Sequence, residues 1–367
     1  MVELPVFYCP RCGFRGKVNE YYWRCPRCGS PLELEYEAVW SPRGSGVARY
    51  STSLPFTPPR SLGEGNTPLV EVDYRGIRVK FKLEYLNPTG SFKDRGSSLA
   101  VGLAFLLGYR RVVEDTSGNT GISVAAYARL YGLRATIVMP EYAPKGKKVL
   151  VKALGGEIVE TPTRGDAALK VLELAASEGN YYVAHTYSPL YVEGAKTVAY
   201  ESWEQGFNGD IVVAPVGSGG LFLGLHRGFS DLEKWGLRRT SHKMIAVEGS
   251  SVIRLYDKLY GSKPSLGGGS RLADGIMVPK PPRLDEILGA LKSTHGEVVV
   301  VNDEEILDAL RELYDYGLIV EPTSATVLAA IKKLIDQGKI GKGEEVLAPL
   351  TGSGLKMIDL LEKLFKT

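Results

Sequence analysis

The sequence has 367 residues, 44% of them hydrophobic and 24% charged, with a formal net charge of +3. This length predicts two or three domains with buried cores, and the near-neutral charge gives no electrostatic reason to expect a nucleic-acid partner. The N-terminus lacks the apolar segment of a signal peptide, and the longest apolar run, 99–107, is too short to cross a membrane. We therefore predict a soluble, cytoplasmic protein that acts on small molecules.

All 4 cysteines lie within the first 28 residues, in two Cys-Pro-Arg-Cys-Gly segments that contain Cys9, Cys12, Cys25 and Cys28. Four thiolates in this pattern are typical of a tetrahedral metal site, and such a site leaves no ligand position open for catalysis. We predict a structural zinc ribbon over 1–38. Iron in place of zinc is one alternative, and a pair of disulfides is another that fits poorly with an intracellular chain.

Residues 39–65 are predicted to form a linker or strap, because 40–59 are rich in Ser, Pro, Gly and Arg and lack periodicity. Further on, β-branched apolar runs alternate with amphipathic segments. The strand-like runs are 78–84, 111–115, 135–140, 156–162, 181–187, 210–216, 243–249, 298–303 and 345–352. The helix-like segments are 99–108, 122–132, 147–156, 167–179, 196–206 and 306–317. This alternation predicts an α/β fold with largely parallel sheets flanked by helices, and the number of strands predicts two lobes.

The stretch NPTGSFKDRG (87–96) places a lysine at the start of a helix. Ser91 and Asp94 have the spacing of a capping box, so Lys93 falls in the first helical turn. The positive end of the helix dipole disfavours an ammonium there, and we expect the pKa of Lys93 to fall. A partly neutral amine is what Schiff-base chemistry with an aldehyde cofactor requires. A lysine whose charge simply reaches water is the alternative.

Three further loops follow predicted strands and combine glycine with hydroxyl or amide side chains. The loop 116–121 leads into a helix, where open N–H groups suit a carboxylate or a phosphate. The glycine-rich loop 216–221 suits a phosphate, but it lacks the lysine of a P-loop and the spacing of a dinucleotide motif. The loop 350–354 offers hydroxyls to a buried heteroatom. Helix capping or glycine packing would explain each loop taken alone.

Taken together, these loops resemble those of the fold-type II pyridoxal-phosphate enzymes, and among them the threonine synthases. The resemblance covers 61–359 and rests on the motifs SLGEGNTPL, NPTGSFKDRG, TSGNTG, EGAKTVAYE, PVGSGG, EPTSAT and LTGSGLK. It implies a two-lobed fold, with a large lobe that binds pyridoxal phosphate over 66–92 and 187–367 and a small mobile lobe over 93–186. It also implies a homodimer.

The resemblance assigns roles to individual residues. Lys93 would be the catalytic residue and would hold the aldehyde of the cofactor as a Schiff base. The other implied cofactor ligands are Asn119 at the phenolic oxygen, Thr351 at the pyridine nitrogen, and, around the phosphate, Gly217, Ser218, Gly219, Gly220 and Leu221. The implied substrate ligands are Ser117, Thr120 and Thr186. A threonine at the pyridine nitrogen favours elimination and replacement over transamination.

The implied reaction converts O-phosphohomoserine and water to threonine and phosphate, so that the expected substrate is a small phosphorylated amino acid. One position departs from the threonine synthase pattern, because Tyr191 stands where an arginine helps to hold the substrate phosphate. A tyrosine donates one hydrogen bond and cannot pair with a phosphate as a guanidinium does. Candidates to replace the arginine, each with the features of a surface charge, are Lys145, Lys147 and Arg271.

Two other functions stay open at this point. A β-elimination or β-replacement enzyme acting on serine, threonine or O-phosphoserine, such as a dehydratase or a cysteate or cysteine synthase, would keep the cofactor and change the leaving group. A regulatory protein that senses a ligand and uses the ribbon for recognition would need no catalysis, and the complete set of cofactor residues argues against it. We place His185 outside the catalytic set, as a residue at the end of a strand.

Overall fold

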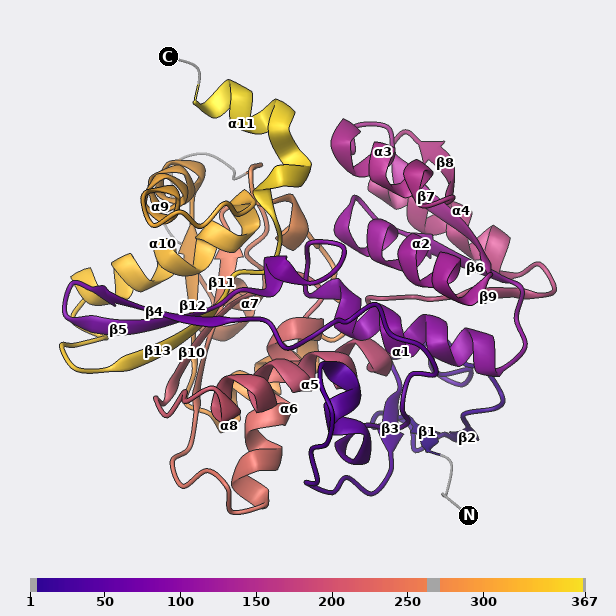
Figure 1. The fold of residues 1–367 in the computed structure, drawn as a ribbon, viewed down its shortest axis with the longest axis horizontal. Coiled ribbons are helices and arrows are strands. Elements are labelled where there is room, and N and C mark those ends of the chain that lie inside the picture. Colours follow the sequence, from indigo (N-terminus) through magenta and orange to yellow (C-terminus); the bar gives the residue numbers. More distant parts are fainter. Residues whose placement is uncertain (1–4, 263–270, 366–367) are drawn as a thin grey trace. The chain divides into compact units, whose positions relative to one another are not determined.

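The computed structural model describes residues 5–262 and 271–365 and divides into two compact units (Figure 1). Unit 1 consists of Met1–Asn66 and Asn87–Gly194, and unit 2 consists of Thr67–Leu86 and Ala195–Thr367. Both units contain a sheet with parallel strands and flanking helices, which confirms the predicted α/β class. Within the described ranges, no helix is long and apolar enough to cross a bilayer.

Unit 1 is built on a four-stranded parallel sheet with the order β8-β7-β6-β9. Its strands are β6 (Arg111–Asp115), β7 (Arg134–Pro140), β8 (Glu157–Thr161) and β9 (Asn180–Tyr182). Its helices are α1 (Lys93–Leu106), α2 (Asn119–Tyr131), α3 (Lys145–Ala153) and α4 (Arg164–Ala175). Helices α2 and α4 pack against β6 and β7, and α1 packs against α2. Because β6 and β9 are parallel neighbours, the loops that follow them lie at the same edge of the sheet.

The N-terminal ribbon is a three-stranded antiparallel sheet within unit 1. Its aromatic side chains pack against β9 and the turn that follows β9. Its strands are β1 (Val6–Tyr8), β2 (Arg15–Lys17) and β3 (Glu33–Glu35). The Tyr21 ring lies 4.1 Å from the Tyr181 ring, and the Tyr21 hydroxyl donates to the carbonyl of Tyr182. The Trp23 ring lies 5.2 Å from Tyr182 and 5.3 Å from Tyr187. Aromatic pairs at these distances add to the stability gained by burial.

Unit 2 contains a six-stranded sheet with the order β12-β11-β10-β13-β5-β4. Its strands are β4 (Leu69–Tyr74), β5 (Ile77–Lys82), β10 (Ile211–Pro215), β11 (Lys243–Gly249), β12 (Glu297–Val301) and β13 (Glu345–Pro349). Only β4, at the edge, pairs antiparallel with its neighbour. Because β10 and β13 are parallel neighbours, the loops that follow them also lie at the same edge.

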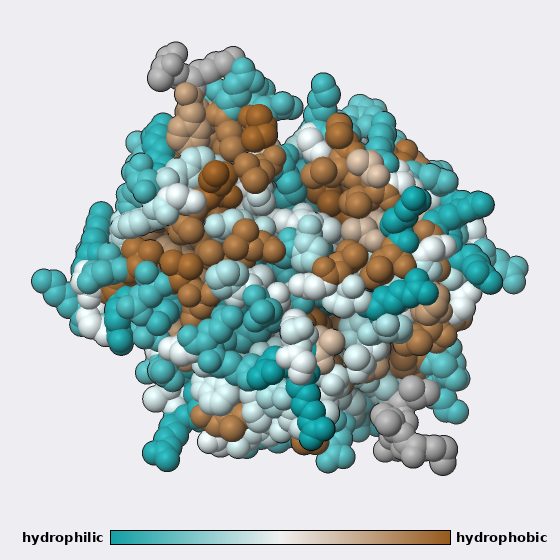
Figure 2. Space-filling view, in the orientation of Figure 1, coloured by the Kyte–Doolittle hydropathy of each residue, from teal (hydrophilic) through white to brown (hydrophobic). Residues whose placement is uncertain are grey.

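Helices cover both faces of this sheet. They are α6 (Gly220–Lys234), α7 (Arg254–Tyr260), α8 (Leu284–Ser293), α9 (Asp303–Asp315), α10 (Pro322–Asp336) and α11 (Ile358–Leu364), and α5 (Pro189–Glu204) begins in unit 1 and ends in unit 2. In Figure 1, α10 lies on one side of the sheet and α6 and α8 lie on the other. Figure 2 shows apolar side chains at the surface over α11, where Ile358 is 55% exposed.

A buried ion pair crosses the interior of unit 2. The Lys82 side chain is 0% exposed, and its Nζ lies 2.8 Å from Glu201 Oε2. The same Nζ donates to the carbonyl of Thr67 at 2.6 Å and to Gln205 Oε1 at 2.9 Å. Three acceptors therefore compensate an ammonium that has lost its hydration.

The predicted strands and helices are all present, with differences at their ends. The run 181–187 was expected to be one strand, but β9 ends at Tyr182 because Ala184 takes a left-handed conformation with φ of 51°. Residues 69–74, which form β4, were not predicted as a strand. The predicted strap contains a 3-10 helix at Val47–Ser53.

Candidate active site

The loop before α1 is held by Asp94, which is fully buried. Its carboxylate accepts hydrogen bonds from Thr89 N at 2.7 Å, from Thr89 Oγ1 at 2.6 Å and from Ser123 Oγ of α2 at 2.6 Å. The predicted capping box with Ser91 is therefore wrong. Phe92 is the N-cap, and because its backbone is already helical, Ser91 Oγ is left buried without a hydrogen bond.

Lys93 is the first residue of α1, as the sequence predicts, and it is half-buried. Its Nζ lies 4.5 Å from the centre of the Phe92 ring. Burial raises the pKa of Glu114 and lowers the pKa of His185, and the charge of Lys93 acts on both groups, so the three share one electrostatic environment in unit 1.

The loop between β6 and α2 presents side chains that are not used for capping. The N-cap of α2 is Gly118, and the backbone N–H of this glycine donates to Thr116 Oγ1 at 3.0 Å. Neither Ser117 nor Thr120 makes a side-chain hydrogen bond to any residue that the structure describes. Their hydroxyls and the N-terminus of α2 are therefore available to an anion.

Lys147 of α3 lies directly over this loop. It is only 2% exposed, and a Cβ added to Gly118 would lie 3.1 Å from the Lys147 Nζ. The expectation that Lys147 is a surface charge is therefore wrong, whereas Lys145 and Arg271 are exposed as expected. Because no side chain separates them, the ammonium of Lys147 adjoins the loop that carries Ser117 and Thr120.

Tyr191 is packed inside unit 1. Its ring covers Gly96, where a Cβ would collide with it, and its hydroxyl lies 2.8 Å from Ser97 Oγ. The residue is 3% exposed, and burial raises its pKa well above the usual value. A neutral hydroxyl already paired with Ser97 does not supply the cation that an arginine would supply at this position.

His185, in the turn after β9, is a buried base in contact with a buried acid, Glu114 of β6. His185 Nδ1 is hydrogen-bonded to Glu114 Oε1 of β6, and the His185 backbone N–H donates to Glu114 Oε2 at 3.4 Å. Glu114 is fully buried and His185 is 8% exposed. The next residue, Thr186, is half-buried and makes no side-chain hydrogen bond among residues 5–262 and 271–365.

In unit 2, the loop between β10 and α6 forms a cradle of backbone N–H groups. In the described structure, the N–H groups of Gly217, Ser218, Gly219 and Gly220 donate to no other residue. A Cβ on Gly217 would lie 2.9 Å from the Gly275 carbonyl oxygen, and a Cβ on Gly219, where φ is 94°, would lie 2.6 Å from Ile287 Cδ1. Glycine is therefore required at both positions, and the open N–H groups fit a phosphate.

Thr351 follows β13 at the same edge of the sheet in unit 2 and is 2% exposed. Its Oγ1 lies 3.2 Å from Ser324 Oγ of α10. Ser324 is in turn bonded to Gly352, accepting from its N–H at 2.9 Å and donating to its carbonyl at 3.1 Å. These hydrogen bonds hold the Thr351 hydroxyl in place. The Thr351 loop lies at the same edge of the sheet as the glycine-rich loop after β10.

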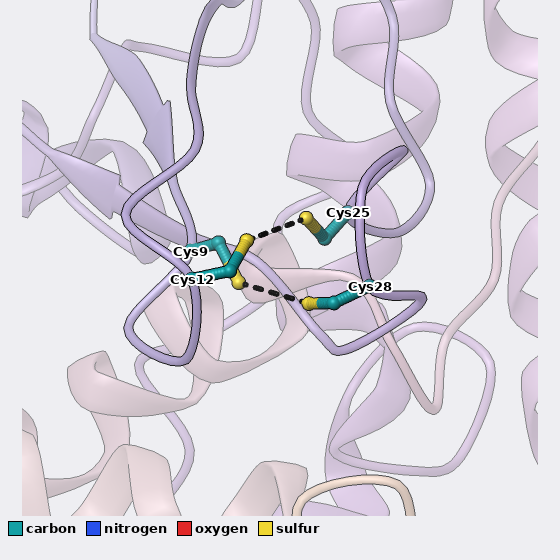
Figure 3. A group of neighbouring side chains, drawn as sticks. All are labelled: Cys9, Cys12, Cys25 and Cys28. Atoms are coloured by element: carbon teal, nitrogen blue, oxygen red, sulfur yellow. Dashed lines mark hydrogen bonds between the residues drawn. The ribbon is translucent and has the colours of Figure 1, made fainter.

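The four cysteines of the ribbon converge on one point (Figure 3). Their Sγ atoms all lie within 4.8 Å of one another, with 3.6 Å between Cys9 and Cys28 and 3.5 Å between Cys12 and Cys25. Four sulfurs at metal–sulfur distances of about 2.3 Å in a tetrahedron would be about 3.8 Å apart. Hydrogen bonds from Ser30 lower the pKa of Cys28 to about 6, which favours the thiolate that a metal binds.

Loops of this kind, at the carboxyl ends of parallel strands, define the class of α/β proteins that hold small anionic ligands and cofactors at strand ends. The chain belongs to the pyridoxal-phosphate dependent enzyme family, whose family model matches residues 60–352. The matched segment contains every predicted cofactor and substrate residue and leaves the ribbon outside.

Relatives and solved structures extend this similarity over most of the chain. A threonine synthase of Bacillus sp. (strain ULM1) is 36% identical over 86% of this chain and 90% of its own length. A threonine synthase of Methanocaldococcus jannaschii is 31% identical over 95% of this chain and 92% of its own length. The crystal structure of an O-acetylserine dependent cystathionine beta-synthase from Helicobacter pylori superposes with a TM-score of 0.68 and 28% identity, covering 80% of this chain and 95% of that one.

The sequence analysis missed the buried residues that form hydrogen bonds to the site loops. Asp94 was interpreted as a capping residue, and Glu114 was not considered at all. One signal for Glu114 was available, because an acidic residue interrupts the apolar run RVVED of a strand predicted to be buried. Ser324 lies within the motif EPTSAT, but only the structure reveals its hydrogen bond to Thr351.

Proposed function

We propose that the chain is a threonine synthase, which converts O-phosphohomoserine and water to threonine and phosphate with pyridoxal phosphate as cofactor. The observation that carries this proposal is the similarity to threonine synthases over 86% and 95% of the chain. The loops of both units support it, because each unit presents groups that suit one part of such a cofactor or substrate.

The proposal assigns the cofactor's contacts unit by unit. In unit 2, the N–H groups of 217–221 bind the phosphate, and Thr351, held by Ser324, donates a hydrogen bond to the pyridine nitrogen. In unit 1, Lys93 binds the aldehyde carbon and Asn119 bonds the phenolic oxygen. The open, glycine-lined cradle and the buried neutral hydroxyl fit this group chemically.

Pyridoxal phosphate, when bound, supplies an aldehyde for an amine and a ring that draws electrons from the substrate's Cα. Lys93 would hold this aldehyde when no substrate is bound, and its Nζ, when free, would move the proton at the substrate's Cα. Ser117 and Thr120, whose hydroxyls are not used by other described residues, hold the substrate carboxylate at the N-terminus of α2. Thr186 contacts the other end of the substrate.

Lys147 is our candidate for the cation that replaces the missing arginine. Its burial over the loop 116–121 places an ammonium beside the proposed substrate residues, whereas Lys145 and Arg271 are exposed. Two anionic groups on one substrate, a carboxylate and a phosphate, suit a loop that combines a helix N-terminus with a buried lysine.

The test is to incubate the cofactor-loaded protein with O-phosphohomoserine and to measure threonine and inorganic phosphate together. We expect the two products in equal amounts, with no comparable phosphate release from O-phosphoserine in a parallel reaction. Turnover of O-phosphoserine or serine without threonine formation would contradict the proposal.

A β-elimination or β-replacement enzyme is the second candidate, and the position of Tyr191 is the observation that favours it. A side chain buried against Ser97 provides no cation for a phosphate. The same assays separate the two functions, because pyruvate or 2-oxobutyrate would mark a dehydratase and a sulfur- or sulfite-containing product would mark a replacement reaction.

We further propose that the four cysteines hold one structural zinc ion. Treatment with a strong chelator should release one zinc per chain and expose 4 reactive thiols, because the sequence contains 4 cysteines and all of them are in the ribbon. Elemental analysis and thiol titration would measure both numbers. Iron in the untreated protein, or 4 reactive thiols before chelation, would contradict the zinc assignment. A homodimer and a cytoplasmic location stay predictions from the resemblance and the sequence.

A further inference from the structure

Glu114 and His185 form a buried pair that the mechanism above does not use. Glu114 lies at the carboxyl end of β6, and His185 lies in the turn after β9, so the pair joins two neighbouring strand ends of unit 1. Nδ1 of His185 is committed to Glu114. Its other ring nitrogen, Nε2, makes no hydrogen bond in the part of the chain that the structure describes. An imidazole more than nine-tenths buried with one open nitrogen is able to act on a ligand.

The pair adjoins the proposed catalytic lysine. The His185 ring packs edge-on against Tyr191 with 6.0 Å between centres, and Tyr191 bonds to Ser97, one turn after Lys93 on α1. His185 also precedes Thr186, a proposed substrate residue. Side-chain contacts through Tyr191 and Ser97 therefore connect the pair to the helix that begins at Lys93.

The charged and titratable groups around the pair come from every element packed against it. They are Lys93 of α1, Asp115 of β6, Arg164 of α4, Tyr191 of α5, Tyr182 of β9 and Tyr21 of the ribbon. Burial raises the pKa of Glu114 and lowers the pKa of His185. Both shifts favour the uncharged form of the pair, in which the Glu114 carboxyl donates to Nδ1 and Nε2 carries the ring proton.

We propose that His185, backed by Glu114, is the acid that protonates the group leaving the substrate side chain. This inference rests on the proposed function. Lys93 removes the proton from Cα and, once that proton has exchanged with solvent, the proton from Cβ, so that its Nζ carries a positive charge. The electron pair of the Cβ–H bond forms a double bond between Cβ and Cγ, and the bond between Cγ and the phosphate oxygen breaks with its electron pair staying on that oxygen. Nε2 gives this oxygen its proton, and the Glu114 proton moves to Nδ1. The resulting Glu114 carboxylate balances the new charge on Lys93.

Lys93 then gives its proton to Cγ, which becomes the methyl group of threonine, and addition of water returns the pair to its starting state. The oxygen of water bonds to Cβ, one water proton passes to Nε2, and Nδ1 returns its proton to Glu114. Lys93 takes up one proton from solvent and gives it to Cα, so that the pair loses and regains one proton while Lys93 moves the protons at Cα, Cβ and Cγ.

The test compares two reactions of the same substrate in the cofactor-loaded protein. Exchange of the α-proton in deuterium oxide, followed by NMR, reports the step assigned to Lys93, and phosphate release from O-phosphohomoserine reports departure of the leaving group. In His185→Gln we expect exchange at nearly the wild-type rate, with phosphate release reduced about 10²–10⁴-fold. In Glu114→Gln, an amide keeps the contact with Nδ1 but cannot pass a proton, so release should fall while exchange continues.

A leaving group that needs no proton provides the discriminating measurement. With the γ-chloro analogue of the substrate, the His185→Gln and Glu114→Gln variants should recover the wild-type rate. Tyr191→Phe, which removes a buried hydrogen bond near the same ring, is the matched control and should retain both reactions. If His185→Gln lost exchange and release together, or lost neither, the acid role would be wrong.

Failure of the proposed function gives a different pattern. A wild-type protein that ignores O-phosphohomoserine but releases phosphate from O-phosphoserine would overturn the threonine synthase assignment, and the pair would then be judged by the same comparison on O-phosphoserine. A wild-type protein that acts on neither compound would overturn both proposals.

Discussion

Replacing Lys93 with alanine is expected to reduce turnover of O-phosphohomoserine by about 10⁴-fold or more. In the proposed function the lysine both binds the cofactor aldehyde and moves the substrate proton, and loss of positioned proton transfer alone costs about 10²–10⁴-fold. Lys93 is the first residue of α1, and Asp94 fixes the loop before it through Thr89 and Ser123. The hydrogen bond from Ser123 to Asp94 connects the start of α1 to α2, the helix that follows the loop 116–121.

Reduction of the loaded protein with borohydride, followed by mass spectrometry, checks the assignment independently of activity. The wild-type chain should retain one cofactor mass on the peptide that contains Lys93, and the Lys93→Ala chain should retain none. Lys170→Ala is the matched control, because the Lys170 side chain is 43% exposed and pairs with Glu173 on the surface of α4. Labelling that persisted in Lys93→Ala would show that another lysine binds the cofactor.

Replacing Lys82 with methionine is expected to lower the free energy of unfolding by about 3–5 kcal/mol. The substitution leaves the Glu201 carboxylate, whose side chain is 4% exposed, without the ammonium that compensates its charge. It also removes donors from the Thr67 carbonyl and from Gln205. Urea unfolding followed by tryptophan fluorescence would measure the change in the transition attributable to unit 2.

Two further variants separate loss of the charge pair from loss of packing. Lys82→Met combined with Glu201→Leu should recover most of the stability, because replacing a whole buried pair by apolar residues is often neutral or stabilising. Lys80→Met removes the pair with Glu71, whose side chain is 47% exposed, and should cost much less stability than Lys82→Met because solvent screens this pair. Equal losses in Lys82→Met and Lys80→Met would contradict the argument from burial.

The sequence predicted the elements of the fold well because β-branched runs and helical spacing are local signals. Strand β4 was missed because its residues alternate with charged ones at a sheet edge, where the pattern is weak. Strand β9 ends before Ala184, whose backbone has a positive φ. No residue in the run 181–187 predicts that an alanine would adopt this left-handed conformation.

The loops of the candidate site could be predicted because glycine and hydroxyl residues follow strand-like runs at fixed positions. The buried side-chain contacts that hold these loops could not be predicted from the sequence. The pairing of Glu114 with His185 joins residues far apart in the chain and depends on β9 lying beside β6, which no local pattern specifies. The burial of Lys147 depends on Gly118, whose missing side chain makes room for the lysine stem. The Ser91 capping box failed because spacing alone does not determine the backbone of Phe92.

The aromatic contacts of the ribbon link its sequence to the sequence of the surface on which it packs. Tyr21 and Trp23 fit against Tyr181, Tyr182 and Tyr187, which flank the turn that carries His185 and Thr186. A ribbon exchanged between relatives would bring its own aromatic loop to a surface that had not adapted to it. These aromatic contacts therefore make the residues of the ribbon and those at the end of β9 depend on each other.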